Sequence, residues 1–386
     1  MKNNSLKNCL LFGAPLAAAL SSQVAAAQTP SRDVDNRPNI ILFISDDCTY
    51  RDLNPYGGVN VQTTNINRLA EEGIRFTNFF QAAPVSSPTR QCLMTGLYPM
   101  KSGAYPNHAR VNDDVISVVQ QMRAQGYRVA LQAKRHFEPL TVFDYEFLSG
   151  GNDDVNIDKI RPFIKDCTSK GQPFVLFVCS HQPHTPWNMG DPSKIDPDAL
   201  VLPSYYVDTP ETRFDYRNYL AEVKYMDDQV GAVDALIDEC GIRDNTVFFY
   251  TSEQGNALPF AKWTLYDMGV QTAMIVRWPG VIKPGSVTDA MGEYVDVVPT
   301  FIEIAGGRPD YNYLEGRSFL PVLKGRTNRH KSEVYAQATS RGVINGPDHY
   351  GIRSVRNERY VYVRNLTPDE LFRCENCDPG KHAYWA

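Results

Sequence analysis

The chain has 386 residues, 42% of them hydrophobic and 22% charged, so it is long enough for one large α/β domain with a smaller appendage. Its formal net charge of −5, without any basic block or stripe, argues against nucleic acid as a partner. An anionic small substrate is not excluded, because such a ligand responds to the local field of its pocket.

The first 27 residues have the pattern of an export signal. A lysine-bearing start precedes an apolar segment at 10–20, and three alanines at 25–27 form a small-residue cleavage site. The apolar segment is short and is interrupted by glycine and proline, so we expect no membrane span. The pattern predicts a secreted or periplasmic protein that begins near Gln28.

Cysteine usage favours buried thiols over a disulfide framework. Of the eight cysteines, Cys9 lies in the leader, and the remainder are spread through a chain too large to need disulfide staples. Cys374 and Cys377 form half of a zinc or redox pattern, but no second pair follows. We expect a local loop disulfide there, or no bond.

Strands and helices alternate from Asn39 onward, which predicts an α/β fold with a mostly parallel central sheet flanked by helices. The apolar run at 39–45 is typical of a central strand buried on both faces. We expect the helix at 115–125 to begin at Asp113 or Asp114. The other predicted elements of a main domain at 37–325 are helices at 64–72 and 216–240 and strands at 127–132, 173–180, 246–251 and 271–278. Short strands at 334–338, 351–355 and 360–363 predict a small C-terminal subdomain at 326–386.

Acidic and amide side chains follow two of the predicted core strands. Asp46 and Asp47 end the first strand, and Glu253 and Gln254 end a later one. Ligands collect at the carboxyl ends of strands in open α/β sheets, and oxygen-rich sites suit Ca²⁺ or Mg²⁺. Taken alone, the two pairs also fit a helix cap and a polar turn.

The segment at 86–96 predicts a helix with a small hydroxyl residue at its N-terminus. Pro88 suits the first helical position and Gly96 suits the end. Ser86 would lie near free backbone N–H groups, where an anion or an oxygen that develops negative charge is favoured. Arg90 adds a permanent cation one turn further on. An ordinary capped helix is the alternative interpretation of this pattern.

Four further basic side chains lie just after predicted strands or in polar loops. Lys134 and His136 follow one strand, His184 follows the next, and Lys262 lies in a loop before the last core strand. Taken alone, Lys134, His136 and Lys262 are more often surface charges than site residues, and a hydrogen-bonded core or loop histidine is the alternative interpretation of His184.

Together and in this order, these motifs resemble those of the sulfatases, over residues 37 to 365. The segment 83–90 resembles the family signature Cys/Ser-x-Pro-Ser/Thr-Arg, and 134–136 resembles its Lys-x-His. The string Pro183-His184-Thr185-Pro186 is frequent in the family, and 260–269 is similar to its Gly-Lys-x-Thr-x-Tyr-Glu-Gly-Gly. Glu253 and Gln254 depart from the usual Asp-Asn, because each side chain is one methylene longer.

The resemblance implies that Ser86 is oxidised to formylglycine by an anaerobic-type maturase, and that the hydrated aldehyde is the nucleophile. It also implies a metal, and the longer side chains favour Ca²⁺ over Mg²⁺, which demands a tight octahedron. The metal ligands that it implies are Asp46, Asp47, Ser86, Glu253 and Gln254.

The remaining motif residues bind and release sulfate in the mechanism that the resemblance implies. Arg90, Lys134 and Lys262 neutralise the sulfate oxygens, and His184 protonates the leaving oxygen. His136 assists the final release of sulfate. We expect His181 to contact these residues and not the substrate. Family members often continue through a longer C-terminal subdomain, so the resemblance implies that this one is short or truncated.

The export signal, the serine-type motif and the aromatic residues of predicted loops favour a sulfated carbohydrate as the substrate, because pockets for such ligands are commonly lined by aromatic side chains. These aromatic residues are Tyr105, Trp187, Tyr205 and Tyr206. The Pro-His-Thr-Pro-Trp string and the loop at 202–203 are similar to those of glycosaminoglycan sulfatases, including sulfamidases. Two alternatives remain at this point. A phosphate mono- or diester hydrolase of the alkaline-phosphatase superfamily could use Ser86 unmodified. A non-catalytic protein could bind sulfated glycans without releasing sulfate.

Overall fold

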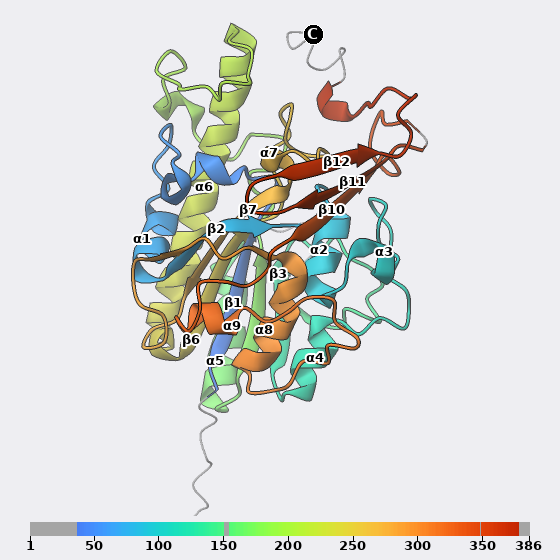
Figure 1. Cartoon of the computed structure of the whole chain (residues 1–386). Helices are drawn as coiled ribbons and strands as arrows, with labels where there is room; N and C mark the ends of the chain where they lie inside the picture. The colour runs from blue at the N-terminus through green and yellow to red at the C-terminus, as the bar shows by residue number, and fades with distance from the viewer. Residues whose placement is uncertain (1–36, 150–153, 348, 378–386) are drawn as a thin grey trace, which may run out of the picture. The chain divides into compact units, whose positions relative to one another are not determined.

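The computed structural model describes residues 37–149, 154–347 and 349–377; the predicted export signal lies outside them. Within these residues, nine strands form the central sheet, in the order β4-β3-β5-β1-β6-β7-β2-β8, with β9 also paired to β2 (Figure 1). The strands are β1 Asn39–Ser45, β2 Ile74–Phe80, β3 Arg128–Ala133, β4 Glu146–Phe147, β5 Phe174–Cys179, β6 Thr246–Ser252, β7 Gln271–Arg277, β8 Ser286–Thr288 and β9 Gly292–Glu293.

The mostly parallel sheet predicted from the sequence is confirmed. Strands β3, β4, β5, β1 and β6 run parallel, and β7 is antiparallel to both of its neighbours, β6 and β2. Every residue of β1 is buried, as its apolar run predicts. Consecutive side chains of β1 point to opposite faces, so Ile40 and Leu42 enter one core and Ile41 and Phe43 enter the other.

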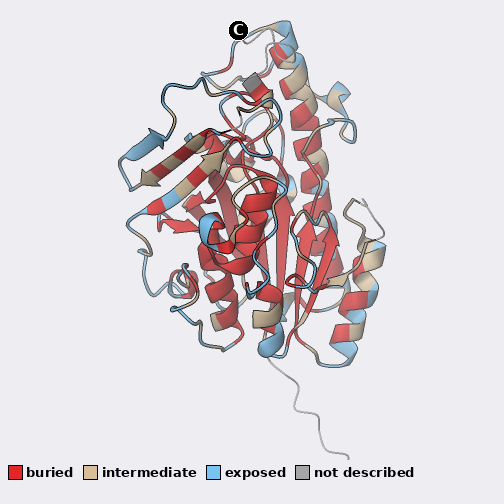
Figure 2. Cartoon of the chain, turned by 90° about the vertical axis from the view of Figure 1, so that its right-hand side faces the viewer, coloured by how far each residue is buried: buried red, intermediate tan, exposed pale blue. Residues whose placement is uncertain are grey.

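Helices cover both faces of this sheet. The core on one side includes residues of α1 (Thr64–Glu72), α5 (Ile157–Ser169) and α6 (Pro210–Glu239). The core on the other side includes residues of α2 (Ser86–Thr95), α4 (Val118–Ala124), α8 (Val297–Ile304) and α9 (Leu320–Leu323), and Figure 2 shows the buried sheet between the two layers. The short helices α3 (Pro99–Ser102) and α7 (Asp267–Val270) lie in connections.

Three helices differ from the sequence-based expectation at their starts. Helix α4 begins at Val118 instead of near Asp113, because Ser117 and Gln120 form a capping box there. Pro88 is the third residue of α2, which begins at Ser86 after an extended Val85. Helix α6 starts at Pro210, before the expected 216, because the Thr209 side chain caps its first turn.

A small antiparallel sheet follows, made of β10 (Val334–Thr339), β11 (Gly351–Arg356) and β12 (Val361–Asn365). Val334 and Ile352 of this sheet pack against Phe80, Leu265 and Val270 in a small apolar cluster that is separate from the two main cores. Within the described residues, none of the helices combines the length and apolarity that a membrane span requires. Cysteines 48, 92, 167 and 179 are buried thiols, as expected.

Candidate active site

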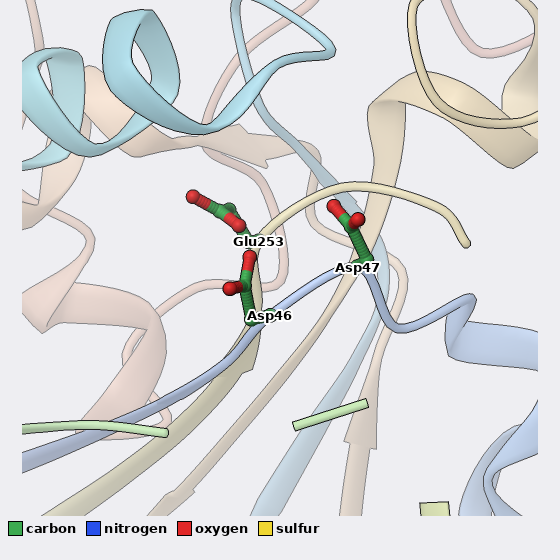
Figure 3. A group of neighbouring side chains, drawn as sticks. All are labelled: Asp46, Asp47 and Glu253. Atoms are coloured by element: carbon green, nitrogen blue, oxygen red, sulfur yellow. The ribbon is translucent and has the colours of Figure 1, made fainter. Parts of the chain in front are cut away.

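The two acidic pairs lie side by side because β1 and β6 are parallel neighbours with Ser45 opposite Ser252. Asp46 and Glu253 follow these two serines directly. Figure 3 shows Glu253 beside Asp46, and it shows Asp47 next to Asp46 on the loop that follows β1. Carboxylate oxygens of Asp46, Asp47 and Glu253 lie within 4.8 Å of one another, and all three residues are buried. Three carboxylates this close in a buried site repel one another unless cations compensate them.

Gln254 completes this cluster from the end of β6. Its Nε2 donates to Asp47 Oδ1 at 2.5 Å and to the Ser86 hydroxyl at 3.2 Å. Its carbonyl oxygen Oε1 is buried and has no hydrogen-bond partner. An orphaned oxygen beside three carboxylates fits the oxygen-only donor set that Ca²⁺ or Mg²⁺ takes, so these residues could hold a metal ion.

Ser86 enters the cluster from the first residue of α2. Its hydroxyl donates to Glu253 Oε2 at 3.0 Å and lies 3.5 Å from Asp46 Oδ1. The preceding loop is held in place by the backbone N–H of Trp263, which donates to the Pro84 carbonyl at 2.8 Å. The start of α2 therefore brings one small nucleophilic side chain into contact with residues from both strand ends.

Cations face the carboxylates from three different elements. Arg90 Nε, one turn into α2, lies 2.5 Å from Glu253 Oε1, and both side chains are fully buried. Lys134, just after β3, forms an ion pair with Asp46 Oδ2, and Lys262 Nζ lies 2.6 Å from Asp47 Oδ2. The guanidinium nitrogens Nη1 and Nη2 of Arg90 have no hydrogen-bond partner, so they are open to an anionic ligand.

Burial and these neighbours set the protonation of the acidic pair. Burial raises the pKa of Glu253, and the negative charge of Asp46 adds to this effect. Burial acts on Asp46 in the same direction, but Lys134 and the hydrogen bond with Glu253 overcome it and hold the pKa of Asp46 well below its usual range. A cation bound here would therefore compete with a proton on Glu253.

His184 lies at the open side of this cluster, with about a third of its side chain exposed. Its Nδ1 donates to the Thr185 carbonyl at 2.6 Å, which leaves Nε2 facing Lys262 Nζ at 3.3 Å and Asp47 Oδ2 at 3.4 Å. Because Nδ1 carries the proton of the neutral ring, Nε2 can give a proton to a ligand atom that reaches the cluster from solvent only when the ring holds both protons.

His136 contacts a residue that the motifs did not indicate. Its Nε2 lies 2.9 Å from Nδ1 of His108, an exposed residue of the loop between α3 and α4. Burial lowers the pKa of His136 to about 3, and the positive charges of Lys134 and Arg90 add to this effect. Only the tertiary contact identifies His108, since Pro-Asn-His in a loop is not a catalytic pattern.

A cavity of about 440 Å³ opens beside Asp46 and Lys134. His181, expected behind the site, instead lines this cavity, together with Asp154 and Asn188. Asp154 Oδ2, His181 Nε2 and Gln182 Oε1 are buried without a hydrogen-bond partner, and all three residues line the cavity.

The structure thus gathers the side chains that the sequence motifs singled out. Hydrogen bonds and ion pairs connect all of them except His136, which is near enough for Lys134 and Arg90 to shift its pKa. The fold and this cluster define an α/β protein with a buried polar site at the carboxyl edge of a mostly parallel sheet.

Comparison with known proteins identifies the family. The family model described as Sulfatase matches residues 38–307, and the model described as N-sulphoglucosamine sulphohydrolase, C-terminal, matches residues 255–383. The chain therefore belongs to the sulfatase family, a family of sulfuric ester hydrolases.

Individual relatives agree with this assignment. The chain is 32% identical over 349 residues to an ulvan-active sulfatase of Formosa agariphila, covering 88% of this chain and 68% of the relative. It spans 62% of the length of a second ulvan-active sulfatase from the same organism. It is 26% identical to the N-sulphoglucosamine sulphohydrolase of Homo sapiens, covering 85% of this chain and 73% of that protein.

Solved structures share the fold at low sequence identity. A crystal structure of Ps i-CgsB in complex with k-i-k-neocarrahexaose superimposes with a TM-score of 0.69 and 21% identity, covering 90% of this chain and 87% of that one. The phosphonate monoester hydrolase of Agrobacterium radiobacter superimposes with a TM-score of 0.66 and 18% identity, covering 85% and 87%. The fold of this chain therefore also occurs in a protein named for a phosphonate ester.

Proposed function

We propose that this chain is a formylglycine-dependent sulfatase that hydrolyses a sulfate ester or sulfamate of a sulfated carbohydrate. The observation that carries the proposal is the position of Ser86. Its hydroxyl contacts Glu253 and Gln254, in a cluster where Arg90, Lys134 and Lys262 supply positive charge. This arrangement suits an oxygen nucleophile next to a tetrahedral dianion.

The nucleophile is the hydrated aldehyde made when a maturase removes two hydrogens from Ser86. One of its hydroxyl oxygens forms a bond to sulfur while the bond from sulfur to the leaving oxygen breaks. His184 Nε2 gives a proton to the leaving oxygen, since this nitrogen faces the cluster and is partly exposed. The second hydroxyl then gives its proton to water and becomes the aldehyde carbonyl, while the bond between its carbon and the departing sulfate oxygen breaks.

Three cationic side chains stabilise the charge on the sulfate oxygens during these steps. Nη1 and Nη2 of Arg90 have no hydrogen-bond partner. Lys134 pairs with Asp46, and Lys262 pairs with Asp47. One such preorganised donor is typically worth about 3 kcal/mol of the barrier. A serine that stayed unmodified could accept sulfate but would lack the carbonyl-forming release step.

A divalent metal fits the same cluster, with Asp46, Asp47, Glu253, Gln254 Oε1 and residue 86 as its ligands. When bound, it would act as a Lewis acid that polarises a sulfate oxygen and favours the ionised nucleophile. We propose Ca²⁺ over Mg²⁺, because the longer arms of Glu253 and Gln254 suit a loose coordination shell.

The substrate class follows from the cavity beside the cluster. It has room for a sugar-sized group at about 440 Å³, and Asp154, His181 and Asn188 supply polar groups for its hydroxyl or amine substituents. Relatives named ulvan-active sulfatase and N-sulphoglucosamine sulphohydrolase support a sulfated sugar.

The location and the domains of the chain are part of the same proposal. Residues 1–27 support export to the periplasm or beyond, and we assign catalysis to residues 37–325 and a small subdomain to residues 326–386.

Mass analysis of the peptide that contains Ser86 tests the proposal. The protein is co-expressed with an anaerobic-type maturase, and the expected result is a peptide lighter by two hydrogens in protein that releases sulfate. An active protein whose Ser86 is unmodified would contradict the mechanism. Protein expressed without the maturase is the matched control, and it should retain both hydrogens and release no sulfate.

A second candidate function is hydrolysis of a phosphate or phosphonate ester by unmodified Ser86. The observation that supports this candidate is the fold that the chain shares with a phosphonate monoester hydrolase. Turnover of an aryl sulfate and an aryl phosphate by the same preparation separates the two candidates. A protein that binds sulfated glycan but turns over neither ester would instead be a non-catalytic binder.

A further inference from the structure

The contact between His108 and His136 connects the proposed site to an outer loop. The two rings lie with their centroids 4.9 Å apart, and Nδ1 of His108 is 2.9 Å from Nε2 of His136. Both residues have left-handed backbone conformations, with φ of 60° and 64°. Such angles are uncommon for residues with a side chain, so the surrounding contacts determine where both rings point.

Asn107 anchors this loop to the C-terminal part of the chain. Its backbone N–H donates to the Arg341 carbonyl at 3.1 Å, and its side-chain Nδ2 donates to the Gly342 carbonyl at 3.1 Å. The same Nδ2 lies 3.0 Å from Nε2 of His108. Because a carbonyl oxygen only accepts, the Gly342 contact determines which end of the amide is the NH₂ group.

The orientation of the Asn107 amide determines which ring nitrogens of His108 and His136 carry protons. The amide N–H of Asn107 donates to His108 Nε2, so a neutral His108 carries its proton on Nδ1. That N–H then donates to His136 Nε2. A neutral His136 must therefore carry its single proton on Nδ1, an atom that is buried without a hydrogen-bond partner.

The surroundings of His136 favour the neutral ring. Lys134 and Arg90 place positive charge near it, Asp46 places negative charge near it, and His108 is the ring in direct contact. Burial and the two cations outweigh the carboxylate, and they lower the pKa of His136 to about 3. A ring that is already neutral and holds an unpaired N–H is a hydrogen-bond donor.

We propose that Asn107 and His108 are positioning residues that hold His136 as the Nδ1–H tautomer, so that His136 donates a hydrogen bond to an oxygen at residue 86. The identity of that oxygen rests on the proposed function, whereas the proton assignment does not. His136 thus assists sulfate release as a hydrogen-bond donor to the residue-86 oxygen that leaves with sulfate, while the proton of the second hydroxyl goes to water. Residues 107–108 and 341–342 thus orient a side chain of the active site through hydrogen bonds.

The tautomer can be measured without activity. In the full chain labelled with ¹⁵N-histidine, the ring nitrogen shifts and couplings of its seven histidines distinguish the two neutral tautomers. Signals are assigned by comparison with single-histidine variants. We expect His108 and His136 both to carry the proton on Nδ1 at neutral pH. A His136 protonated on Nε2 in the unmodified chain would overturn the proposal.

The substitution Asn107→Asp should reverse the direction of the hydrogen bonds from residue 107 through His108 to His136, because a carboxylate accepts a hydrogen bond where the amide donated one. His108 should then carry its proton on Nε2, and His136 should exchange its proton from Nδ1 to Nε2. In matured protein, kcat should fall about 10- to 100-fold with little change in KM, the usual range for a supporting hydrogen bond. Unchanged tautomers and unchanged kcat would contradict a positioning role.

Two further variants keep the test decisive. His108→Phe keeps a ring but removes the donor, and it should lower kcat in the same range while His136 loses its fixed tautomer. Asn245→Asp is the matched control, because Asn245 is exposed and also donates to a backbone carbonyl, that of Arg37. It should leave the spectrum and kcat unchanged. If the tautomers are as expected but no sulfate is released, the proposed function fails and the proton assignment stands.

Discussion

Arg90 Nε lies 2.5 Å from Glu253 Oε1, and this ion pair joins the first turn of α2 to the carboxyl end of β6 with both side chains excluded from water. The pair holds the helix that carries Ser86 against the strand that carries the acidic cluster. Nη1 and Nη2 of Arg90 have no hydrogen-bond partner, so the same guanidinium supports the fold and can still donate to a ligand.

Truncating this arginine should therefore affect stability and catalysis together. Arg90→Ala leaves Glu253 buried without its cation, which typically costs about 3–5 kcal/mol of unfolding free energy. Loss of a charge-stabilising donor should also lower kcat about 10²- to 10³-fold. Urea unfolding and sulfate release measure the two effects. Arg326→Ala, at an exposed position, is the control, and equal behaviour of the two variants would contradict this role.

Removal of divalent metal should inactivate and destabilise the protein. The carboxylates of Asp46, Asp47 and Glu253 then rely on Arg90, Lys134 and Lys262 alone. Adding back Ca²⁺ at about 100 times its Kd should stabilise the fold by about 2.7 kcal/mol, and more than Mg²⁺ at the same concentration. Thermal unfolding across a titration measures this. Glu253→Gln should reduce the effect, and a full response in that variant would exclude Glu253 as a ligand.

His184→Gln should slow hydrolysis most for substrates with poor leaving groups. A sugar alcohol needs a proton as it leaves, and general acid catalysis is typically worth about 10²- to 10⁴-fold. A phenol with a low pKa leaves without help, so its sulfate should be affected much less. Comparing kcat for both substrate types checks the role. His349→Gln, at an exposed position, should change neither rate, and an equal loss for both substrates in His184→Gln would argue against proton donation.

Asp52 should make stability depend on pH independently of the site. Burial raises the pKa of Asp52 from its ordinary value of 3.8 to about 6, although the hydroxyl of Tyr216 donates to it at 2.5 Å. A pKa that is higher in the folded state means that the stabilising contribution is complete below pH 3.8 and is lost as the pH rises through 6. At pH 7.5 the ionised group costs on the order of 3 kcal/mol.

Asp52→Asn should remove this dependence. The variant should gain stability relative to the unmodified chain as the pH rises from 4 to 7.5, and lose that advantage below about pH 4. Urea unfolding at several pH values gives the difference between the two proteins. A constant difference across this range would show that Asp52 has the same pKa folded and unfolded.

Several elements could not be predicted from the sequence because tertiary contacts override local signals. Helix α8 contains β-branched residues and Pro299, which weaken its local helical signal, yet burial of every residue except Glu303 stabilises it. Helix α5 contains Pro162, and it is stabilised by one buried face whose apolar residues recur at helical spacing. Strand β2 mixes polar and apolar residues at positions that pair with β7 and β8. The start of α4 depends on a capping box at Ser117 that competes with two nearby aspartates.

By itself, the sequence predicted the core strands β1, β3, β5, β6 and β7, the family and the residues of the candidate site. Apolar runs mark buried strands, and the polar residues that follow them must meet at one edge when the strands are parallel, so Asp46 and Glu253 were predictable neighbours. The contact of His108 with His136 joins residues 28 positions apart and depends on Asn107 reaching the Gly342 carbonyl. Only the tertiary structure decided that contact, because side-chain hydrogen bonds between loops depend on where the packed elements leave each loop.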